Sequence, residues 1–406
     1  MKNKVLGSTL IIAGTAVGAG MLAMPLTSAQ MGFGLTFVLL FLLWVLLTYT
    51  ALLYAEVHQH DKNDAGIASL TEKYFGKNGR LFVNFILLFF MYAVLTAYVT
   101  GSGDLLFGLL PESMMGNGDI ARKISSLMFS IGFGLIVTLG ISVADVTNRI
   151  SFSLKVLVFI AILFLLFNKV SLPNLQASPT NNLLFFSAMP VFFMTFGFHI
   201  CTPTINEYLE GDNKKVKLAC FLGSTGIFII YIVWQFATHG VLEQSTLIEI
   251  LNKDPSLNGL IEAFKVTTGS NHLGEIIRVF SILALITSYI GVALGLSSAV
   301  KDLLMHFNLR HDRITIGLIT FLPPIIVGFT YPKIFLSAFA FAGIIFAFIG
   351  VILPVLLTYK ARIAHPEGTQ TRGGTPALVI ATLFAVVIMI AYLLSIFTDV
   401  LPTVTG

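Results

Sequence analysis

The sequence predicts an all-α polytopic membrane protein with eleven transmembrane helices. Two observations lead to this fold class. Hydrophobic residues make up 56% of the chain and charged residues 11%, with a mean hydropathy of +0.90, whereas soluble domains carry about 25% charged residues. The apolar residues also fall into charge-free windows of about 20 residues, the length that crosses a bilayer. A soluble globular protein is therefore excluded.

The predicted spans follow from these windows and from the turn signals between them. The run from Val5 to Ala55 carries no charge, and Gln30-Met31-Gly32-Phe33-Gly34 divides it into the first two spans. The eleven spans are residues 6–29, 34–56, 82–106, 124–143, 149–168, 182–206, 217–239, 278–300, 314–331, 333–358 and 375–398. We expect one transmembrane domain over residues 1–406, made of two five-helix repeats (1–168 and 182–358) and an extra helix (375–398).

The distribution of basic residues predicts the orientation. Most of the 24 Lys and Arg fall in loops on the side of the N-terminus, and such loops face the cytoplasm. The N-terminus is thus expected inside and the C-terminus outside. The basic residues are scattered in short loops, so no nucleic-acid partner is indicated. The two cysteines, Cys201 and Cys220, do not form a disulfide framework.

Two connections are longer than the others. Residues 57–80 are polar and predict a short helix that ends near Gly76. In residues 240–277, Leu257, Leu260, Ile261 and Phe264 follow Pro255 at helical spacing, which predicts an amphipathic helix at the outer surface. This helix either caps an outer vestibule or packs against the bundle.

The first span contains Gly14, Gly18 and Gly20, followed by Pro25. Each glycine weakens a helix by about 1 kcal/mol relative to alanine. Loosened backbone in the membrane persists only where it is buried or lines a cavity, so we expect a broken helix. Its N–H groups suit a carboxylate, and its carbonyls suit an ammonium group or a cation. The alternative is close helix packing through the Gly14-xxx-Gly18 spacing.

The sixth span carries a second unusual stretch. Pro190 lies near its start, and Thr195-Phe196-Gly197-Phe198-His199 lies at its centre, with Pro203 beyond. The first and sixth spans each open a run of five. Interrupted helices at corresponding positions of two halves indicate a transporter site at an inverted-repeat interface.

These stretches resemble the bacterial hydroxy and aromatic amino acid permease family, of the amino acid/polyamine/organocation superfamily, and within it the tyrosine-specific permeases. The first match is Gly14-Thr15 followed by Gly18-Ala19-Gly20-Met21-Leu22-Ala23-Met24-Pro25, and the second is Phe196-Gly197-Phe198-His199. Three further stretches agree with the family: Tyr49-Thr50-Ala51-Leu52-Leu53, Gly291-Val292-Ala293-Leu294-Gly295-Leu296 and Thr320-Phe321-Leu322-Pro323-Pro324. The flanks Thr195 and Ile200 depart from it, since the family more often has a serine and a glycine there.

The resemblance implies a leucine-transporter-like fold with a 5+5 inverted repeat plus one helix, and a place in the bacterial inner membrane. It implies a symporter that imports an aromatic amino acid by alternating access, with the proton gradient as driving force and no cofactor. L-Tyrosine is favoured, and tryptophan or phenylalanine is the alternative. No P-loop, nucleophile motif or metal-ligand spacing occurs in the sequence, so we expect no enzyme and no metal site.

The resemblance also implies which backbone groups bind the substrate. The N–H groups of Gly18, Ala19 and Gly20 would hold the carboxylate, and Thr15 and Ala16 would supply carbonyls. The opposing stretch would complete the site for the ammonium group; it comprises Thr195, Phe196, Gly197 and Phe198.

The pocket for the substrate side chain should be aromatic and partly polar, because a buried phenol without a partner costs about 1 to 3 kcal/mol. Phe196 and Phe198 can offer ring faces. Hydroxyl groups are available from Tyr92, Tyr98, Thr287 and Ser288. The alternative for each polar residue is ordinary hydrogen bonding between helices.

Two ionisable residues are candidates for proton coupling. An unperturbed histidine titrates near neutral pH, and His199 follows the broken stretch. We expect His199 either to contact the substrate or relay a proton, or to be a neutral core histidine. Lys155 lies about two turns into the fifth span. In the proton-coupled transporters that the chain resembles, a lysine of the fifth span occupies the sodium site of sodium-coupled relatives. The alternative is that Lys155 reaches the membrane surface.

Other membrane classes are less well supported. A channel should show a repeated pore-loop motif, and a sensor should carry a soluble signalling domain. Neither pattern is present in the sequence. A secondary transporter is therefore the favoured class, with a membrane-embedded amino acid sensor or a channel as the alternative.

Overall fold

The computed structural model describes residues 4–61, 65–110 and 118–402, and within these residues all regular structure is helical. Ten of the described helices are long and apolar enough to cross a membrane, and α1 with α2 makes an eleventh, bent span. The spans are α1 (Lys4–Ala16) with α2 (Gly20–Ser28), α3 (Gly32–His58), α4 (Ile67–Phe107), α5 (Gly118–Leu139), α6 (Ile141–Phe167), α8 (Leu184–Thr195) with α9 (Thr202–Tyr208), α10 (Asn213–Val241), α13 (Asn271–His306), α14 (Arg313–Thr330), α15 (Phe335–Ala347) with α16 (Leu353–Ala364), and α17 (Gly374–Phe397). The predicted fold class and its two broken helices are confirmed.

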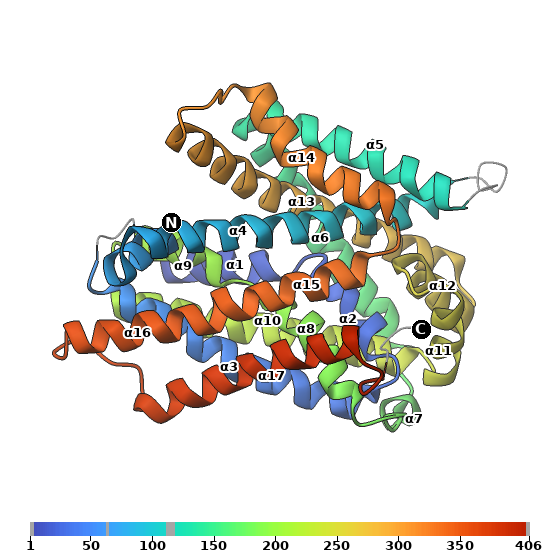
Figure 1. Ribbon diagram of the computed structural model, residues 1–406. Helices are drawn as coiled ribbons and strands as arrows, with labels where there is room; N and C mark the ends of the chain where they lie inside the picture. Colours follow the sequence, from blue (N-terminus) through green and yellow to red (C-terminus); the bar gives the residue numbers. More distant parts are fainter. Residues whose placement is uncertain (1–3, 62–64, 111–117, 403–406) are drawn as a thin grey trace.

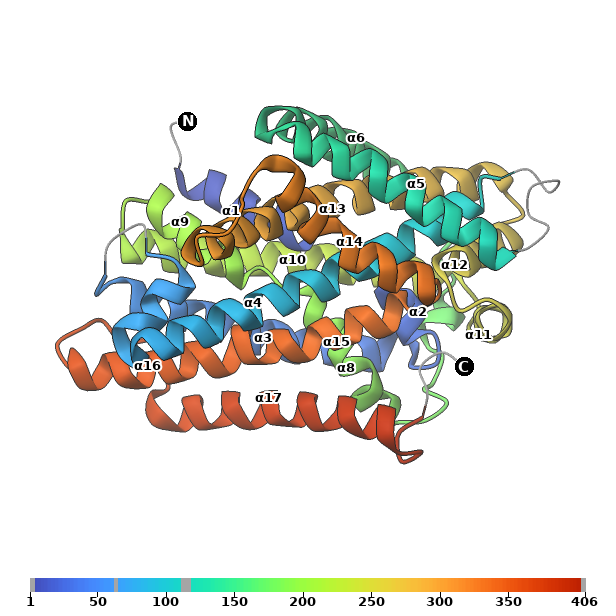
Figure 2. The same cartoon turned by 45° about the horizontal axis from the view of Figure 1, so that its top comes forward.

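The spans run alternately in opposite directions (Figure 1), as successive membrane crossings must. α10 packs along α3 and α1, while α13 packs along α6 and α4. In Figure 1, α5, α13 and α14 gather at the top, and α16 and α17 run along the lower side. Figure 2 shows α6 and α5 on one flank of the molecule and α17 on the other. The outward faces of α6 and α14 carry exposed apolar side chains such as Phe164 and Ile314, as a lipid-facing surface requires.

The predicted short helix before the third span is present, but it is joined to that span. The resulting α4 bends at Gly76, whose φ of 70° and ψ of −174° depart from helical values. Glycine is required there because a side chain would be strained at this positive φ. The short helix therefore begins at Ile67 and ends at the predicted residue.

The predicted amphipathic helix is α12 (Leu257–Thr268), and a second helix, α11 (Gln244–Lys253), precedes it. All four apolar residues predicted to share one face of α12 are buried. The pair lies on the side opposite the N-terminus (Figure 1). Arg122 of α5 holds the pair there, because its guanidinium lies 3.2 Å from the Asp104 carboxylate of α4 and 3.3 Å from the Asp254 carboxylate between α11 and α12.

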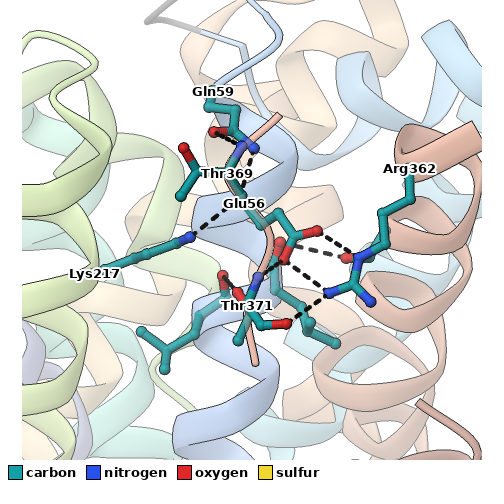
Figure 3. Close-up of polar contacts among 9 residues, drawn as sticks. Glu56, Gln59, Lys217, Arg362, Thr369 and Thr371 are labelled. Carbon is teal, nitrogen blue, oxygen red and sulfur yellow. Dashed lines mark hydrogen bonds and ion pairs between the residues drawn. The ribbon is translucent and has the colours of Figure 1, made fainter. Parts of the chain in front are cut away.

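On the side of the N-terminus, Glu56 at the end of α3 binds Arg362 of α16. The two pairs of atoms, Nε to Oε1 and Nη2 to Oε2, are 2.7 and 3.0 Å apart. The Thr371 backbone N–H also donates to Glu56, at 2.6 Å. Figure 3 shows how Glu56 of α3, Gln59 just after α3 and Lys217 of α10 converge on the segment before α17. This ion pair ties α3 to α16 and to that segment.

Candidate functional site

The first span is interrupted between Ala16 and Gly20, where α1 and α2 meet at a bend of 51°. Only short local turns remain within the break. Gly18 N–H donates to Ala16 O at 2.8 Å, and Met21 N–H donates to Gly18 O at 3.2 Å. Backbone groups that a continuous helix would pair internally are thus released to other partners.

Side chains from three other helices bind these released groups. The Tyr231 hydroxyl of α10 lies 2.8 Å from Ala16 O. The Lys155 ammonium of α6 donates to Val17 O at 2.8 Å, and Ala19 N–H donates to the Ser288 hydroxyl of α13 at 3.1 Å. Buried polar backbone groups need such partners, so these side chains allow the break to exist inside the membrane.

The sixth span is interrupted at Phe196–Phe198, between α8 and the 3-10 turn His199–Cys201 that leads into α9. The two breaks lie against each other. A Cβ atom at Gly20 would be 3.4 Å from Thr195 Cα and 3.3 Å from its Cγ2 atom. The Tyr231 hydroxyl lies 2.7 Å from Thr195 O as well as 2.8 Å from Ala16 O. One hydroxyl proton binds only one of these carbonyls at a time. Ala16 O also accepts from Gly18 N–H, so Thr195 O is the carbonyl left open to a cationic group when the hydroxyl points to Ala16 O.

A cavity of about 570 Å³ lies beside the two breaks. This volume falls within the range of about 300–1,000 Å³ that is typical of small-molecule sites. The cavity extends along α1 toward the side of the N-terminus, as far as Leu10 and Asn148. Its walls come from α1, α2, α4, α6, α8, α13 and α15, together with the Gly197 and Ile200 region of the sixth span.

Most of the predicted substrate-binding residues line this cavity. They are Thr15, Ala16, Gly18, Ala19, Gly20, Tyr98, Thr195, Gly197, Thr287 and Ser288. None of the described lining residues carries a charged side chain. Apart from side-chain hydroxyl groups and the Asn148 amide, the polar groups of these residues are the backbone N–H and C=O groups of the breaks. Such groups suit a ligand that carries both an anionic and a cationic group.

Four predicted residues, Tyr92, Phe196, Phe198 and His199, are absent from the described lining of the cavity. The Tyr92 hydroxyl donates to Ile319 O of α14 at 2.7 Å. Phe196 and Phe198 are fully buried, and Phe196 packs edge to face on Tyr231. These placements agree with helix packing, the alternative that accompanied the prediction for Tyr92.

His199 is fully buried on the far side of the second break. Its Nε2 atom lies 2.9 Å from the Thr50 hydroxyl of α3, and its ring makes edge-to-face contacts with Tyr54 and Phe346. Its Nδ1 atom has no hydrogen-bond partner among the described residues. In this arrangement His199 links the second break to α3 and α15 and does not face the cavity.

Lys155 is 3% exposed and lies next to the first break. Besides Val17 O, its ammonium group donates to the Thr287 hydroxyl at 3.1 Å and lies 4.8 Å from the centre of the Phe152 ring. Phe152 itself lines the cavity. The side chain is therefore turned into the protein and does not reach the membrane surface, so the alternative of a surface anchor is wrong.

Several lining residues were not predicted as site residues. Phe152, Phe339 and Met194 supply apolar wall, and Asn148 supplies a buried amide oxygen that lacks a partner among the described residues. Tyr231 joins the two breaks from α10. One signal in the sequence was available: Gly291 and Gly295 are one helical turn apart on α13 and both line the cavity.

Comparison with known proteins agrees with this architecture. Residues 1–392 match the model of the tryptophan/tyrosine permease family. Two proteins of Haemophilus influenzae are similar to the chain: tyrosine-specific transport system 1 (45% identity, over 95% of this chain and 96% of that protein) and tyrosine-specific transport system 2 (44% identity, over the full length of both).

The crystal structure of MhsT in complex with L-phenylalanine superposes with a TM-score of 0.61 at 17% identity, and the match covers 96% of this chain and 98% of MhsT. That likeness shows a leucine-transporter-like fold, and the family is one of permeases and not of enzymes. The chain is thus a multi-pass membrane protein that belongs to the tryptophan/tyrosine permease family.

Proposed function

We propose that this protein is a proton-coupled symporter that imports an aromatic amino acid, with L-tyrosine as the preferred substrate, by alternating access across the bacterial inner membrane. The N-terminus would lie in the cytoplasm and the C-terminus in the periplasm. The substrate preference is supported by the names of the two Haemophilus influenzae relatives. The orientation is supported by the excess of basic residues in loops on the side of the N-terminus.

The observation that carries the proposal is the Lys155 ammonium group on Val17 O. It places an ionisable group on the same broken backbone whose next N–H groups line the cavity. A proton on Lys155 makes this group a cation bound to the break. Loss of the proton leaves a neutral amine, which holds Val17 O less strongly. Binding at the break and protonation of Lys155 are therefore expected to influence each other, which is what symport requires. His199 is a second proposed proton carrier, but it is not among the described residues that line the cavity.

The cavity supports the position of the substrate. The substrate carboxylate would lie against the N–H groups of Gly18, Ala19 and Gly20. The substrate ammonium group would face the carbonyls of Ala16 and Thr195. The aromatic ring would lie among the apolar side chains of α4, α13 and α15. No cofactor enters this scheme, because the proton gradient supplies the free energy.

The test is uptake of labelled tyrosine into proteoliposomes under an imposed pH gradient without sodium. With one proton per substrate, a gradient of one pH unit supports an accumulation of about tenfold, since one pH unit is worth about 1.36 kcal/mol. A protonophore should abolish it. Unlabelled tyrosine, tryptophan, phenylalanine and leucine serve as competitors. Stronger competition by tryptophan would change the substrate, and no accumulation under any gradient would favour the sensor alternative.

The Lys155→Ala variant tests the coupling itself. It should exchange labelled for unlabelled tyrosine across the membrane but should no longer accumulate tyrosine in response to the pH gradient. Full accumulation by this variant would remove Lys155 from the mechanism while leaving substrate transport in place.

A further inference from the structure

The Ser288 hydroxyl occupies a position that a substrate carboxylate would need. We propose that Ser288 is a positioning residue that fills this position while the site is empty, and that the carboxylate of the substrate displaces its hydroxyl when it binds. The proposal rests on the proposed function only in that the ligand is an amino acid with a free carboxylate. It replaces the expectation that Ser288 serves the phenol of the substrate.

The geometry at the first break carries this step. Ala19 N–H donates to Ser288 Oγ at 3.1 Å. The backbone of Gly18 comes so close to α13 that a Cβ atom on it would lie 2.2 Å from Ser288 Oγ, though 3.6 Å from Ser288 Cβ. The contact thus involves only the hydroxyl, which can move by rotation about one side-chain bond, while the α13 backbone stays where it is.

A carboxylate competes well for this position. Hydrogen bonds from N–H groups to an ionised acceptor are roughly twice as strong as those to a neutral hydroxyl. The displaced Ser288 hydroxyl stays in a polar part of the cavity, which Tyr98 of α4 also lines. The Ala19 N–H group therefore stays paired in both the empty and the occupied site.

The position of Ser288 in the chain gives the exchange a second consequence. The preceding residue, Thr287, accepts a hydrogen bond from the Lys155 ammonium group at 3.1 Å. Adjacent side chains of α13 thus contact the ionisable group and the carboxylate position. The carboxylate would displace the Ser288 hydroxyl one residue away from Thr287, which binds Lys155. Substrate binding and protonation of Lys155 would therefore both act on this turn of α13.

The experiment compares the Kd of L-tyrosine for the purified full-length protein and for its Ser288→Ala variant. The variant leaves Ala19 N–H without this partner in the empty site, and a buried unpaired donor is costly. Binding should therefore become tighter, by about fivefold or more. Ser297→Ala is the matched control, because Ser297 lies on the same helix with its hydroxyl 3.3 Å from Thr320 and is outside the described lining of the cavity. Its Kd should equal that of the parent protein.

Tyramine, which keeps the phenol and the ammonium group but lacks the carboxylate, separates this role from a general loosening of the pocket. Ser288→Ala should tighten tyrosine binding and leave the Kd of tyramine unchanged. Unchanged or weaker tyrosine binding by Ser288→Ala would overturn the proposal, as would an equal gain for tyramine. If the parent protein binds neither tyrosine, tryptophan nor phenylalanine, the proposed function itself fails.

Discussion

The ion pair between Glu56 and Arg362 allows the stability of the helix bundle to be tested. The Glu56 side chain is 2% exposed and that of Arg362 is 13% exposed. In Figure 3 the carboxylate faces both the guanidinium and the Thr371 backbone. Removing one partner of a buried ion pair leaves the other charge uncompensated, at a cost of about 3–5 kcal/mol. Because Arg362 retains some exposure and still donates to Thr371 O, we expect Glu56→Gln to lose about 3 kcal/mol, the lower end of that range.

The assay is equilibrium unfolding in mixed micelles, and the quantity compared between variants is the free energy of unfolding. The matched control is Asp145→Asn, which breaks the pair of Asp145 with Arg149, whose side chains are 46% and 78% exposed. Such exposed pairs contribute at most about 1 kcal/mol, so the control should be nearly neutral. A loss for Glu56→Gln no larger than for the control would refute the burial argument. In Glu56→Gln combined with Arg362→Gln, part of the lost stability should return, because the uncompensated charge is gone.

Three further substitutions test the site. Gly18→Leu should abolish tyrosine binding while the protein still inserts into membranes. The reason is that even a Cβ atom at this residue would lie only 2.2 Å from Ser288 Oγ. Unchanged affinity for tyrosine would exclude the carboxylate position at this break. Tyr231→Phe should weaken tyrosine binding about fivefold, since it removes the hydroxyl shared by the two breaks and a hydrogen bond of this kind is worth about 1 kcal/mol. An unaltered Kd would show that the breaks need no bridge. His199→Phe should lower the free energy of unfolding by about 0.5–1.5 kcal/mol, because the Thr50 hydroxyl loses this hydrogen bond and keeps only its contact with Leu47 O. The Kd of tyrosine should stay within about twofold, and a large change in Kd would place His199 in the binding site.

The fold could be predicted from the sequence to the extent that the bilayer dictates it. Charge-free windows fix the spans, because each span must be about 20 residues long and satisfy its own backbone. The interruption of the tenth span escaped this reasoning. The π-helix Phe348–Ile352 separates α15 from α16, and the Tyr54 hydroxyl of α3 donates to its Ile349 O at 2.6 Å. The partner that supports this irregular turn lies about 300 residues earlier in the chain, so no local pattern announces it.

The site divides in a similar way. The backbone breaks could be predicted, because glycines in a membrane helix reveal them locally. Which side chains surround the breaks could not be predicted, because this depends on how the helices face one another. Tyr92 and Tyr98 show the difference: they are six residues apart on α4, which rotates them by about 120° relative to each other. Tyr98 lines the cavity, whereas Tyr92 donates to α14. No periodicity within α4 shows which face meets the breaks.

The partners of the first break suggest which hydrogen bonds would change during the proposed transport cycle. Tyr231 comes from α10, which packs along α1 and α3. Lys155 and Ser288 come from α6 and α13, which pack along each other. A movement of the α1 and α10 group against the α6 and α13 group would keep the contact of Tyr231 with Ala16 O and would strain the other two. Both of the other contacts involve groups that the proposed ligands charge or displace, since a proton gives Lys155 its charge and a carboxylate displaces the Ser288 hydroxyl. Proton and substrate would then act on the same two contacts that hold the moving parts together, so each ligand would alter the free energy of the movement directly.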